Sequence, residues 1–305
     1  MPPRAPSPPP TPSHAQLRAF HAVATAQSFT EAARALGVSQ PAVSMQVRSL
    51  EEAYGVELFA RGRHRVEPTE LGRALLDAIR PIFSLEAEAA ELLGRAGGLL
   101  SGHLRVGADA PFVVVPMLAA FRARHAQVTL SLSLGNSSEV LRDLLDERTD
   151  VAAISDRVED PRLFAVAAAK SRQVVVVAEG HPWARRRSVR LRDLHGAPMV
   201  IREEGSVTRG AFEAAIQRAG VEPEVVMELG SREAIQEAVA AGIGAGVVIE
   251  AERGHDARLV ALPISDAGIE HVTYVACLQE RRRLRAVSAF FEHVPRLPRS
   301  AKRAR

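Results

Sequence analysis

Apolar residues recur with helical spacing at the start of the chain. Leu17, Phe20 and Ala24 fall on one face of a segment from about His14 to Gln27, which predicts an amphipathic helix. His21 lies on the same face, and a packed core or boundary residue explains it better than a metal ligand does. The pattern therefore predicts the first helix of a small helical domain.

Two short helices joined by a tight turn are predicted between residues 28 and 58. Thr30 can cap the first of them, and Gly37 is free to take the positive φ with which helices often end. Ser39 then precedes Gln40 and Pro41, so the second helix begins with a hydroxyl cap and a proline in its first turn. The segment is expected to form a helix, a turn and a second helix.

The second of these helices has two different faces. Its inward positions are Ala42, Val43, Val47 and Leu50. The opposite face carries small or hydrogen-bonding side chains: Gln40, Ser44, Met45 and Arg48. Such a face fits the major groove of DNA, although an ordinary helical hairpin would show the same spacing. The spacing alone leaves both interpretations open.

A hairpin and a long helix are predicted next. Gly62 forms the tip of an arginine-rich hairpin that ends at Pro68, and Thr69 caps a helix that continues to about Arg95. Pro81 should kink this helix mildly. Its apolar stripe extends too far for one small domain to cover: Leu71, Leu75, Ile79, Ile82, Leu85, Ala89 and Leu92. Glycines from Gly94 to Gly102 then indicate a boundary.

The remaining two thirds of the chain alternate between strand and helix patterns, which predicts an α/β fold with mostly parallel sheets. Strands are predicted at 103–107, 128–134, 151–154, 174–178, 199–201, 225–229, 245–248, 259–262 and 272–278. Amphipathic helices are predicted around 112–124, 138–146, 208–219 and 232–241.

The run from Ala32 to Arg61, AARALGVSQPAVSMQVRSLEEAYGVELFAR, resembles the DNA-binding domain of the LysR-type transcriptional regulators. The resemblance implies an α+β multidomain protein with a winged helix-turn-helix (14–68), a dimerisation linker helix (69–96) and a two-lobed effector domain like periplasmic binding proteins. Lobe I would comprise 103–170 and 272–294, and lobe II 171–268. Residues 1–13 and 295–305 would be disordered tails, the first rich in proline and the second basic.

The resemblance also implies partners and contacts. These regulators form homodimers through the linker helix, often assemble into tetramers, bind interrupted palindromes in promoter DNA, and act on RNA polymerase, more often as activators. Gln40 and Ser44 would reach base edges, with Pro41 against a thymine methyl group or sugar. Ser39, Arg48, Arg61 and Arg63 would contact phosphates or the minor groove. Met45 stands where the family more often has a polar or basic side chain, so it would make an apolar contact.

Ligands of open α/β sheets bind beyond the carboxyl ends of the strands. That rule selects a set of loop residues as effector ligands: Asp109, Asn136, Ser137, Ser155, Ser206, Thr208, Arg209 and Ser231. The group around Ser206 and Arg209 predicts an anion site, and Asp109 can be a helix cap or the partner of a ligand ammonium. GHLRVGADAP and REEGSVTR also resemble the branch associated with aminoethylphosphonate catabolism, so a zwitterionic effector such as 2-aminoethylphosphonate is a hypothesis.

Composition and motifs limit which other classes of protein the chain could belong to. The chain has 305 residues, a net charge of +3 and a single cysteine, Cys277, which excludes a disulfide framework and suits a reducing cytoplasm. The proline-rich start has no apolar segment of a signal peptide, and no apolar run reaches the length of a membrane span. Gly242 to Gly246 follows a helix and lacks the spacing of a dinucleotide loop. No catalytic or metal motif is present, so we expect no enzyme activity and no cofactor; a periplasmic binding protein does not explain residues 14–95.

Overall fold

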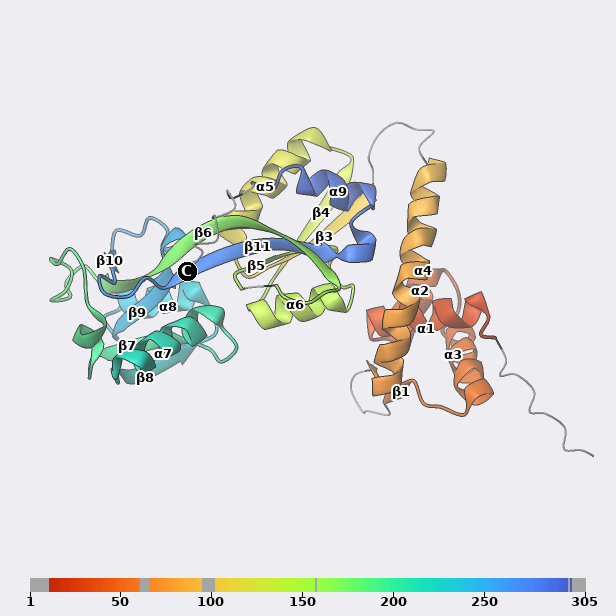
Figure 1. Cartoon of the computed structure of the whole chain (residues 1–305), viewed down its shortest axis with the longest axis horizontal. Coiled ribbons are helices and arrows are strands. Elements are labelled where there is room, and N and C mark those ends of the chain that lie inside the picture. The colour runs from red at the N-terminus through yellow and green to blue at the C-terminus, as the bar shows by residue number, and fades with distance from the viewer. Residues whose placement is uncertain (1–10, 61–65, 95–101, 157, 296, 298–305) are drawn as a thin grey trace, which may run out of the picture. The chain divides into compact units, whose positions relative to one another are not determined.

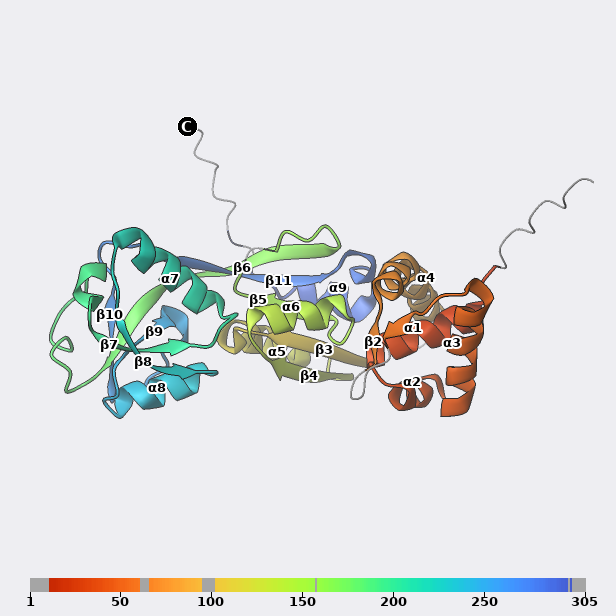
Figure 2. The same ribbon diagram turned by 90° about the horizontal axis from the view of Figure 1, so that it is seen from below.

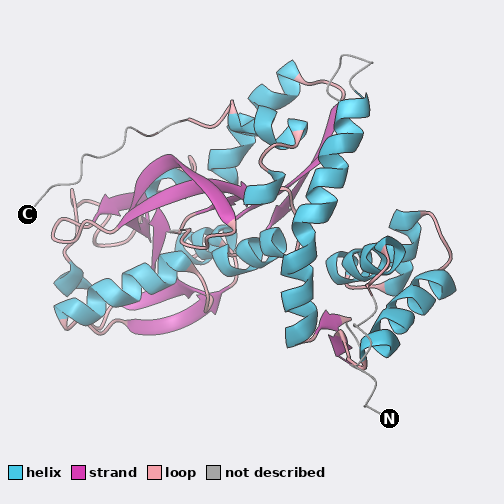
Figure 3. Ribbon diagram, turned by 45° about the vertical axis from the view of Figure 1, so that its right-hand side comes forward, coloured by secondary structure: helices cyan, strands magenta, loops and turns pink. Residues whose placement is uncertain are grey.

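The structure, a computed structural model, describes residues 11–60, 66–94, 102–156, 158–295 and 297. Contacts divide the chain into two compact units. The first contains Met1–Gly98, Asp146–Arg148 and Arg283–Arg285, and the second contains Leu99–Leu145, Thr149–Arg282 and Ala286–Arg305. Most of both predicted tails, the hairpin tip and the glycines at 97 and 98 lie outside the described residues. Figure 3 shows a mainly helical first unit and a second unit built on strands.

The first unit begins with three helices, α1 (His14–Ala26), α2 (Phe29–Leu36) and α3 (Gln40–Tyr54). The prediction that Thr30 caps α2 is wrong: the Ser28 hydroxyl accepts from the backbone N–H of Glu31 at 3.3 Å, one turn into the helix. Gly37 ends α2 at φ +67°, and Ser39 caps α3, as predicted. Apolar residues of these three helices then form the core of the unit: Phe20, Val23, Ala32, Val43, Val47 and Leu50.

A hairpin and a long helix complete the first unit. Strands β1 (Phe59–Ala60) and β2 (Glu67–Pro68) pair antiparallel, and α4 (Glu70–Gly94) follows. Thr69 Oγ1 accepts from the N–H of Gly72 at 3.0 Å, which confirms Thr69 as its cap, and α4 continues through Pro81. The apolar stripe is covered only in part: Ile79 is buried, as is the neighbouring Leu76, whereas Leu71 at the start of the helix is 50% exposed. The later apolar residues Ile82, Leu85, Leu92 and Leu93 are exposed within this chain.

The second unit is organised around one long, mixed sheet (Figure 1). Its strands in chain order are β3 (Gly102–Ala108), β4 (Val128–Leu134), β5 (Val151–Ile154), β6 (Leu163–Ala178), β7 (Pro198–Arg202), β8 (Glu224–Leu229), β9 (Ala245–Ile249), β10 (Leu259–Pro263) and β11 (Glu270–Leu278). In space, the described strands follow the order β4-β3-β5-β11-β6-β9-β7-β8, with β10 paired to β6. Every predicted strand is present, which confirms the alternation of strands and helices. The prediction of mostly parallel pairing is wrong, because β11 pairs antiparallel with β5 and β6, and β6 pairs antiparallel with β9 and β10.

Strand β6 joins the two halves of this unit. Its residues up to Arg172 pair with β11, and from Gln173 onward they pair with β9 and β10. We define lobe I as the part containing β3, β4, β5, β11 and the first half of β6, and lobe II as the part containing β7 to β10 and its second half. Only residues 174–178 of this strand were predicted, because the preceding LFAVAAAKSRQ lacks the β-branched run that follows it.

Helices cover both faces of the sheet. In lobe I these are α5 (Pro111–Arg124), α6 (Ser137–Leu145) and α9 (Arg285–Phe291), and in lobe II they are α7 (Val207–Ala219) and α8 (Arg232–Ala240). Figure 2 shows α7 and α8 on opposite faces of the sheet. Alternate β6 side chains point to opposite faces, so Val175 and Val177 pack with α7 while Val174 and Val176 pack with α8. Among the described residues, 3₁₀ turns complete the unit at η2 (Leu191–Leu194), η3 (Glu250–Glu252) and η4 (Gln279–Arg281). None of the helices in the described ranges is long and apolar enough to span a membrane.

Candidate functional site

The outer face of α3 is exposed and rich in hydrogen-bonding groups. Gln40 and Ser44 lie one turn apart, and the Gln40 amide donates to the Ser44 hydroxyl at 2.8 Å. Pro41 lies exposed in the same first turn, and Met45 is 62% exposed. An exposed methionine next to a paired amide and hydroxyl has no packing role in this unit. The α3 face therefore presents two polar groups and one apolar group for a partner.

The basic residues near this face are only partly described. Arg48 follows Ser44 by one turn, and its guanidinium forms a 3.4 Å ion pair with Glu52 while its side chain stays 80% exposed. An exposed pair of this kind contributes little stability, so exchanging Glu52 for a phosphate costs little. Arg61 and Arg63 of the predicted hairpin lie outside the described residues.

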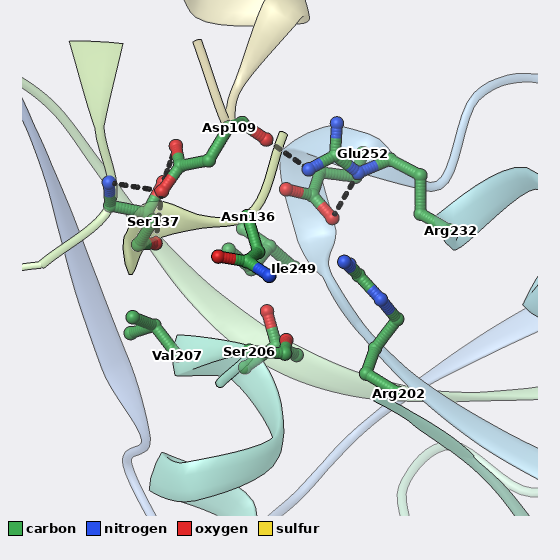
Figure 4. A pocket seen from close by; sticks show the side chains of 11 residues that line it. Asp109, Asn136, Ser137, Arg202, Ser206, Val207, Arg232, Ile249 and Glu252 are labelled. Atoms are coloured by element: carbon green, nitrogen blue, oxygen red, sulfur yellow. Dashed lines mark hydrogen bonds and ion pairs between the residues drawn. The ribbon is translucent and has the colours of Figure 1, made fainter. Parts of the chain in front are cut away.

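A small polar cavity lies in the second unit between lobes I and II (Figure 4). Its volume is about 20 Å³, enough for roughly one water molecule, so a larger ligand requires the lobes to separate. Six of the predicted effector residues line it: Asp109, Asn136, Ser137, Ser155, Ser206 and Thr208. They come from the ends of β3, β4 and β5 and from the start of α7, as the strand-end rule predicts.

Asp109 accepts three hydrogen bonds from other residues of lobe I. Its carboxylate accepts from the backbone N–H of Ser155 at 2.8 Å, from the hydroxyl of Ser155 at 3.0 Å, and from the hydroxyl of Ser137. Burial raises the pKa of Asp109, and these hydrogen bonds oppose the rise. Each serine uses its only proton on this carboxylate, so in this arrangement both hydroxyls can only accept from a ligand. The part of the lobe I wall around Asp109 therefore favours a ligand group that donates hydrogen bonds.

The lobe II wall differs from the lobe I wall because it presents hydrogen-bond donors to the cavity. Ser206 precedes α7, is 6% exposed, and its hydroxyl makes no capping hydrogen bond. The first N–H groups of the helix have no intrahelical acceptors, and the helix dipole makes this end attractive to an anion. Thr208 is buried in the first turn of the same helix. The start of α7 is therefore a suitable position for an anionic ligand group.

Three charged residues of the cavity were not among the predicted ligands. Arg202 ends β7, Arg232 begins α8, and Glu252 lies in η3 just after β9. Arg232 forms a 3.2 Å ion pair with Glu252 and donates to the backbone carbonyl of Asp109 across the cleft. Arg202 makes a bidentate contact of 2.7 Å with Glu203 and points toward Glu252 in Figure 4. The strand-end rule, applied to β9, would have found Glu252.

Two predicted effector residues do not line the cavity. Arg209 lies in α7, where its guanidinium contacts Glu213 at 2.7 Å and Glu228 at 2.8 Å. Ser231 is occupied as the cap of α8, where its hydroxyl accepts from the N–H of Ala234 at 3.1 Å. The guanidinium groups at the cavity are instead those of Arg202 and Arg232.

A buried hydrogen-bonded chain behind the cavity connects its two walls. The Gln173 amide of β6 donates to the carbonyl of Thr208 at 2.7 Å and contacts Nε2 of His271 at 2.8 Å. His271 lies in β11 and hydrogen-bonds to the backbone of Ser155 in lobe I. Burial lowers the pKa of His271, so the neutral ring accepts from Gln173. Both strands that join the lobes thus contribute to positioning the walls of the cavity.

Two family profiles match the chain. Residues 14–73 match the profile described as bacterial regulatory helix-turn-helix protein, lysR family. Residues 97–297 match the LysR substrate binding domain. They match parts of both units and leave residues 74–96, most of α4, between them; the second alone covers more than half of the chain.

Named relatives support the same assignment. The RuBisCO operon transcriptional regulator of Allochromatium vinosum is 34% identical over 92% of this chain and 94% of its own length. The HTH-type transcriptional activator CmpR of a Synechocystis strain is 31% identical over 76% of this chain and 77% of its own length. The CcmR regulatory domain of Synechocystis PCC6803, solved in complex with 2-PG, is 26% identical with a TM-score of 0.59, over 63% of this chain and 95% of that one.

These names bear on two of the predictions. The curated relatives are transcriptional regulators, which supports the prediction that this chain is not an enzyme. Their names connect them with the RuBisCO operon and with activation, and neither refers to aminoethylphosphonate. The resemblance to the aminoethylphosphonate branch therefore gains no support from these relatives.

Proposed function

Since the chain belongs to the LysR family of bacterial transcriptional regulators, we propose that α3 reads a specific promoter sequence and that a small anionic metabolite controls the outcome. The protein acts as a homodimer that recognises an interrupted palindrome and more often activates than represses. The exposed polar and apolar face of α3 is the observation that carries the DNA-binding part. The cavity lined by Arg202, Arg232 and Ser206 carries the effector part.

The DNA contacts follow from the chemistry of the α3 face. Gln40 and Ser44 reach base edges in the major groove, where an amide can pair with adenine and a hydroxyl with several bases. Met45 contacts a thymine methyl group, and Arg48 contacts a phosphate. Ser39 and the hairpin arginines Arg61 and Arg63, together with Pro41, complete the set of DNA contacts. Two such helices in a dimer would enter successive major grooves.

The dimer proposal rests on the uncovered part of α4. Leu85 is 62% exposed, and Ile82 and Leu92 are each 45% exposed, on a helix whose Leu76 and Ile79 are buried. Burial of such a stripe against a second copy removes apolar surface from water. We propose that residues 69–96 form the dimerisation helix, that the lobes have the boundaries predicted above, and that dimers combine into tetramers that contact RNA polymerase.

The effector proposal combines the cavity with the relatives. Two arginines and a helix N-terminus suit a phosphate or carboxylate, and a solved relative holds 2-PG in its regulatory domain. We therefore place small phosphorylated or carboxylic acids before 2-aminoethylphosphonate. A zwitterion remains a second candidate, because the lobe I wall accepts hydrogen bonds. The target genes are proposed to be of the kind that the RuBisCO operon regulators control.

The DNA-binding proposal is tested with Gln40→Ala. On a selected operator duplex, loss of the amide should reduce affinity by about 1–3 kcal/mol, whereas affinity for unrelated DNA should stay the same. Gln46→Ala, on another side of α3, is the matched control. Fluorescence anisotropy with both duplexes measures this, and an equal loss on both would make Gln40 a phosphate contact instead of a base contact.

The effector proposal is tested by thermal stability in the presence of 2-PG, inorganic phosphate, carboxylic acids and 2-aminoethylphosphonate. An effector at a hundred times its dissociation constant adds about 2.7 kcal/mol of stability. A shift with 2-PG or another simple acid supports the proposal. A shift with 2-aminoethylphosphonate alone would favour the zwitterion, and no shift with any anion would exclude the proposed effector class.

A further inference from the structure

Glu252 is a buried acid in the wall of the proposed effector cavity. Its side chain is only 2% exposed, although a glutamate is among the residues least often buried. Four other charged groups face it from three elements: Arg232 and Glu233 on α8, Arg202 at the end of β7, and Asp109 at the end of β3. Glu252 is thus an anion that the protein itself supplies to a pair of arginines.

The carboxylate occupies the position that an incoming anion needs. Arg232 forms an ion pair with Glu252, with Nε 3.2 Å from a carboxylate oxygen but not aligned for a hydrogen bond, and Arg202 points toward the same carboxylate (Figure 4). A phosphate or carboxylate that enters the cavity therefore meets arginines that already have a counter-ion. The ligand and Glu252 cannot both remain charged at low cost, because two anions at such close range repel each other strongly in a poorly hydrated cavity.

We propose that an anionic effector takes the place of the Glu252 carboxylate between Arg202 and Arg232, and that Glu252 takes up a proton from solvent when this happens. No covalent bond changes; one proton moves from solvent to a Glu252 oxygen for each ligand bound. The inference rests on the proposed effector function. It adds that the Glu252 carboxylate competes with the effector for the two arginines. Arg232, which also contacts Asp109 across the cleft, would thereby transmit ligand binding to the closure of the lobes.

The raised pKa of Glu252 is consistent with this exchange. Burial raises the pKa of Glu252 to about 7, while Arg232 and Arg202 oppose the rise and Asp109 and Glu233 add to it. The free protein near neutral pH therefore contains both protonation states of Glu252. Ligand binding selects the neutral state, so affinity for an anion should fall as pH rises above this range.

The expected change in affinity follows from the linkage between protonation of Glu252 and binding of the anion. If the complex holds neutral Glu252 and the free protein has a pKa of about 7, Glu252→Gln should bind an anion about tenfold more tightly than the native chain at pH 8. The difference should shrink to about twofold at pH 7 and almost disappear at pH 6. Glu250→Gln, in the same 3₁₀ turn but outside the cavity lining and paired with exposed Arg172, is the matched control.

The experiment is titration calorimetry of the full chain with 2-PG and with inorganic phosphate, at each pH in two buffers of different ionisation enthalpy. The native chain and Glu250→Gln should take up close to one proton per ligand at pH 8, and Glu252→Gln should take up much less. The proton count of the native chain is decisive in one direction even if Glu252→Gln does not fold, because binding at pH 8 without proton uptake would by itself overturn the exchange. Since phosphates can also take up a proton near neutral pH, assignment of an observed uptake to Glu252 comes from the variant.

The outcomes separate this inference from the function on which it rests. Binding of an anion without proton uptake by the native chain would overturn the exchange at Glu252 and leave the effector proposal intact. Proton uptake that persists in Glu252→Gln would assign the proton to another group and would also overturn it. No binding of either probe by the native chain would count against the effector class and the exchange together.

Discussion

Asp109 offers a sharp test of how the cavity is built. As a structural anchor, it joins the end of β3 to Ser137 of α6 and to Ser155 after β5 through three hydrogen bonds. As a ligand group, it would instead hold a ligand ammonium. The two roles predict different behaviour for Asp109→Ala and Asp109→Asn.

The expected magnitudes follow from the three partners. In Asp109→Ala the N–H and hydroxyl of Ser155 and the hydroxyl of Ser137 lose their acceptor in a buried site. An unsatisfied buried donor costs about 1–3 kcal/mol, and relief of the buried charge offsets part of the sum, so we expect a loss of about 3–5 kcal/mol. In Asp109→Asn the amide oxygen can accept from the Ser155 N–H and from Ser137, while its NH₂ group donates to the Ser155 hydroxyl. All three partners remain satisfied, so the expected loss is about 1 kcal/mol.

Urea unfolding followed by far-ultraviolet circular dichroism measures both variants in the full chain. Because the chain has two units, the comparison uses the transition of the effector unit, identified by the fluorescence of Trp183 in lobe II. Thermal shift with 2-PG and with 2-aminoethylphosphonate then reports ligand binding. We expect Asp109→Asn to retain the response to a simple acid.

Two results would refute this account of Asp109. An Asp109→Ala chain as stable as the native one would show that the three hydrogen bonds do not anchor lobe I. An Asp109→Asn chain of native stability that loses its response only to 2-aminoethylphosphonate would assign the carboxylate to a ligand ammonium.

Three further predictions concern other parts of the molecule. Arg48→Ala should weaken binding to all DNA sequences alike and lower the slope of log affinity against log salt by about 1, as measured by anisotropy titrations; an unchanged slope would remove Arg48 from the phosphate contacts. Leu85→Glu should convert the proposed dimer to monomer in sedimentation velocity, because it places a charge in the uncovered stripe of α4; a dimer that survives this change and the same change at Leu92 would argue against α4 as the interface. Glu252 has a folded-state pKa of about 7, above its usual 4.5, so folding favours its neutral form. As pH rises from 4.5 to 7, the free energy of unfolding of the native chain should fall by about 3 kcal/mol relative to that of Glu252→Gln. Urea unfolding at several pH values measures this, and parallel pH profiles for the two chains would contradict it.

Local signals predicted much of the fold. Ser39, Pro41 and Gly37 specify the helix-turn-helix through backbone geometry that any structure must satisfy, and these predictions are confirmed. The valine run in the second half of β6 predicts a strand equally clearly. The first half of β6 carries no such signal, because its alanines and polar residues form a strand only through pairing with β11. Likewise Ser28 and Thr30 are both chemically able to cap α2, and sequence alone does not distinguish their positions.

The cavity shows what a strand-end rule can and cannot supply. It located Asp109, Ser155 and Ser206, because backbone direction alone determines where such residues lie. It did not distinguish Arg209, whose two glutamate partners hold it away from the cavity, from Arg202, which ends a strand. The spacing in the sequence indicates the pair of Arg209 with Glu213, one turn further along α7. It does not indicate Glu228, which lies on β8 and becomes a partner of Arg209 only through the tertiary fold.

Selection of binding sites from a pool of random DNA duplexes tests the central claim most directly. The full chain, incubated with and without 2-PG, should enrich duplexes that share two inverted half-sites, and Gln40→Ala should lose this preference while still binding DNA. Enrichment of one such sequence family would establish sequence-specific recognition by α3. Recovery of duplexes without a shared sequence, or the same preference in Gln40→Ala, would contradict the proposed recognition by α3.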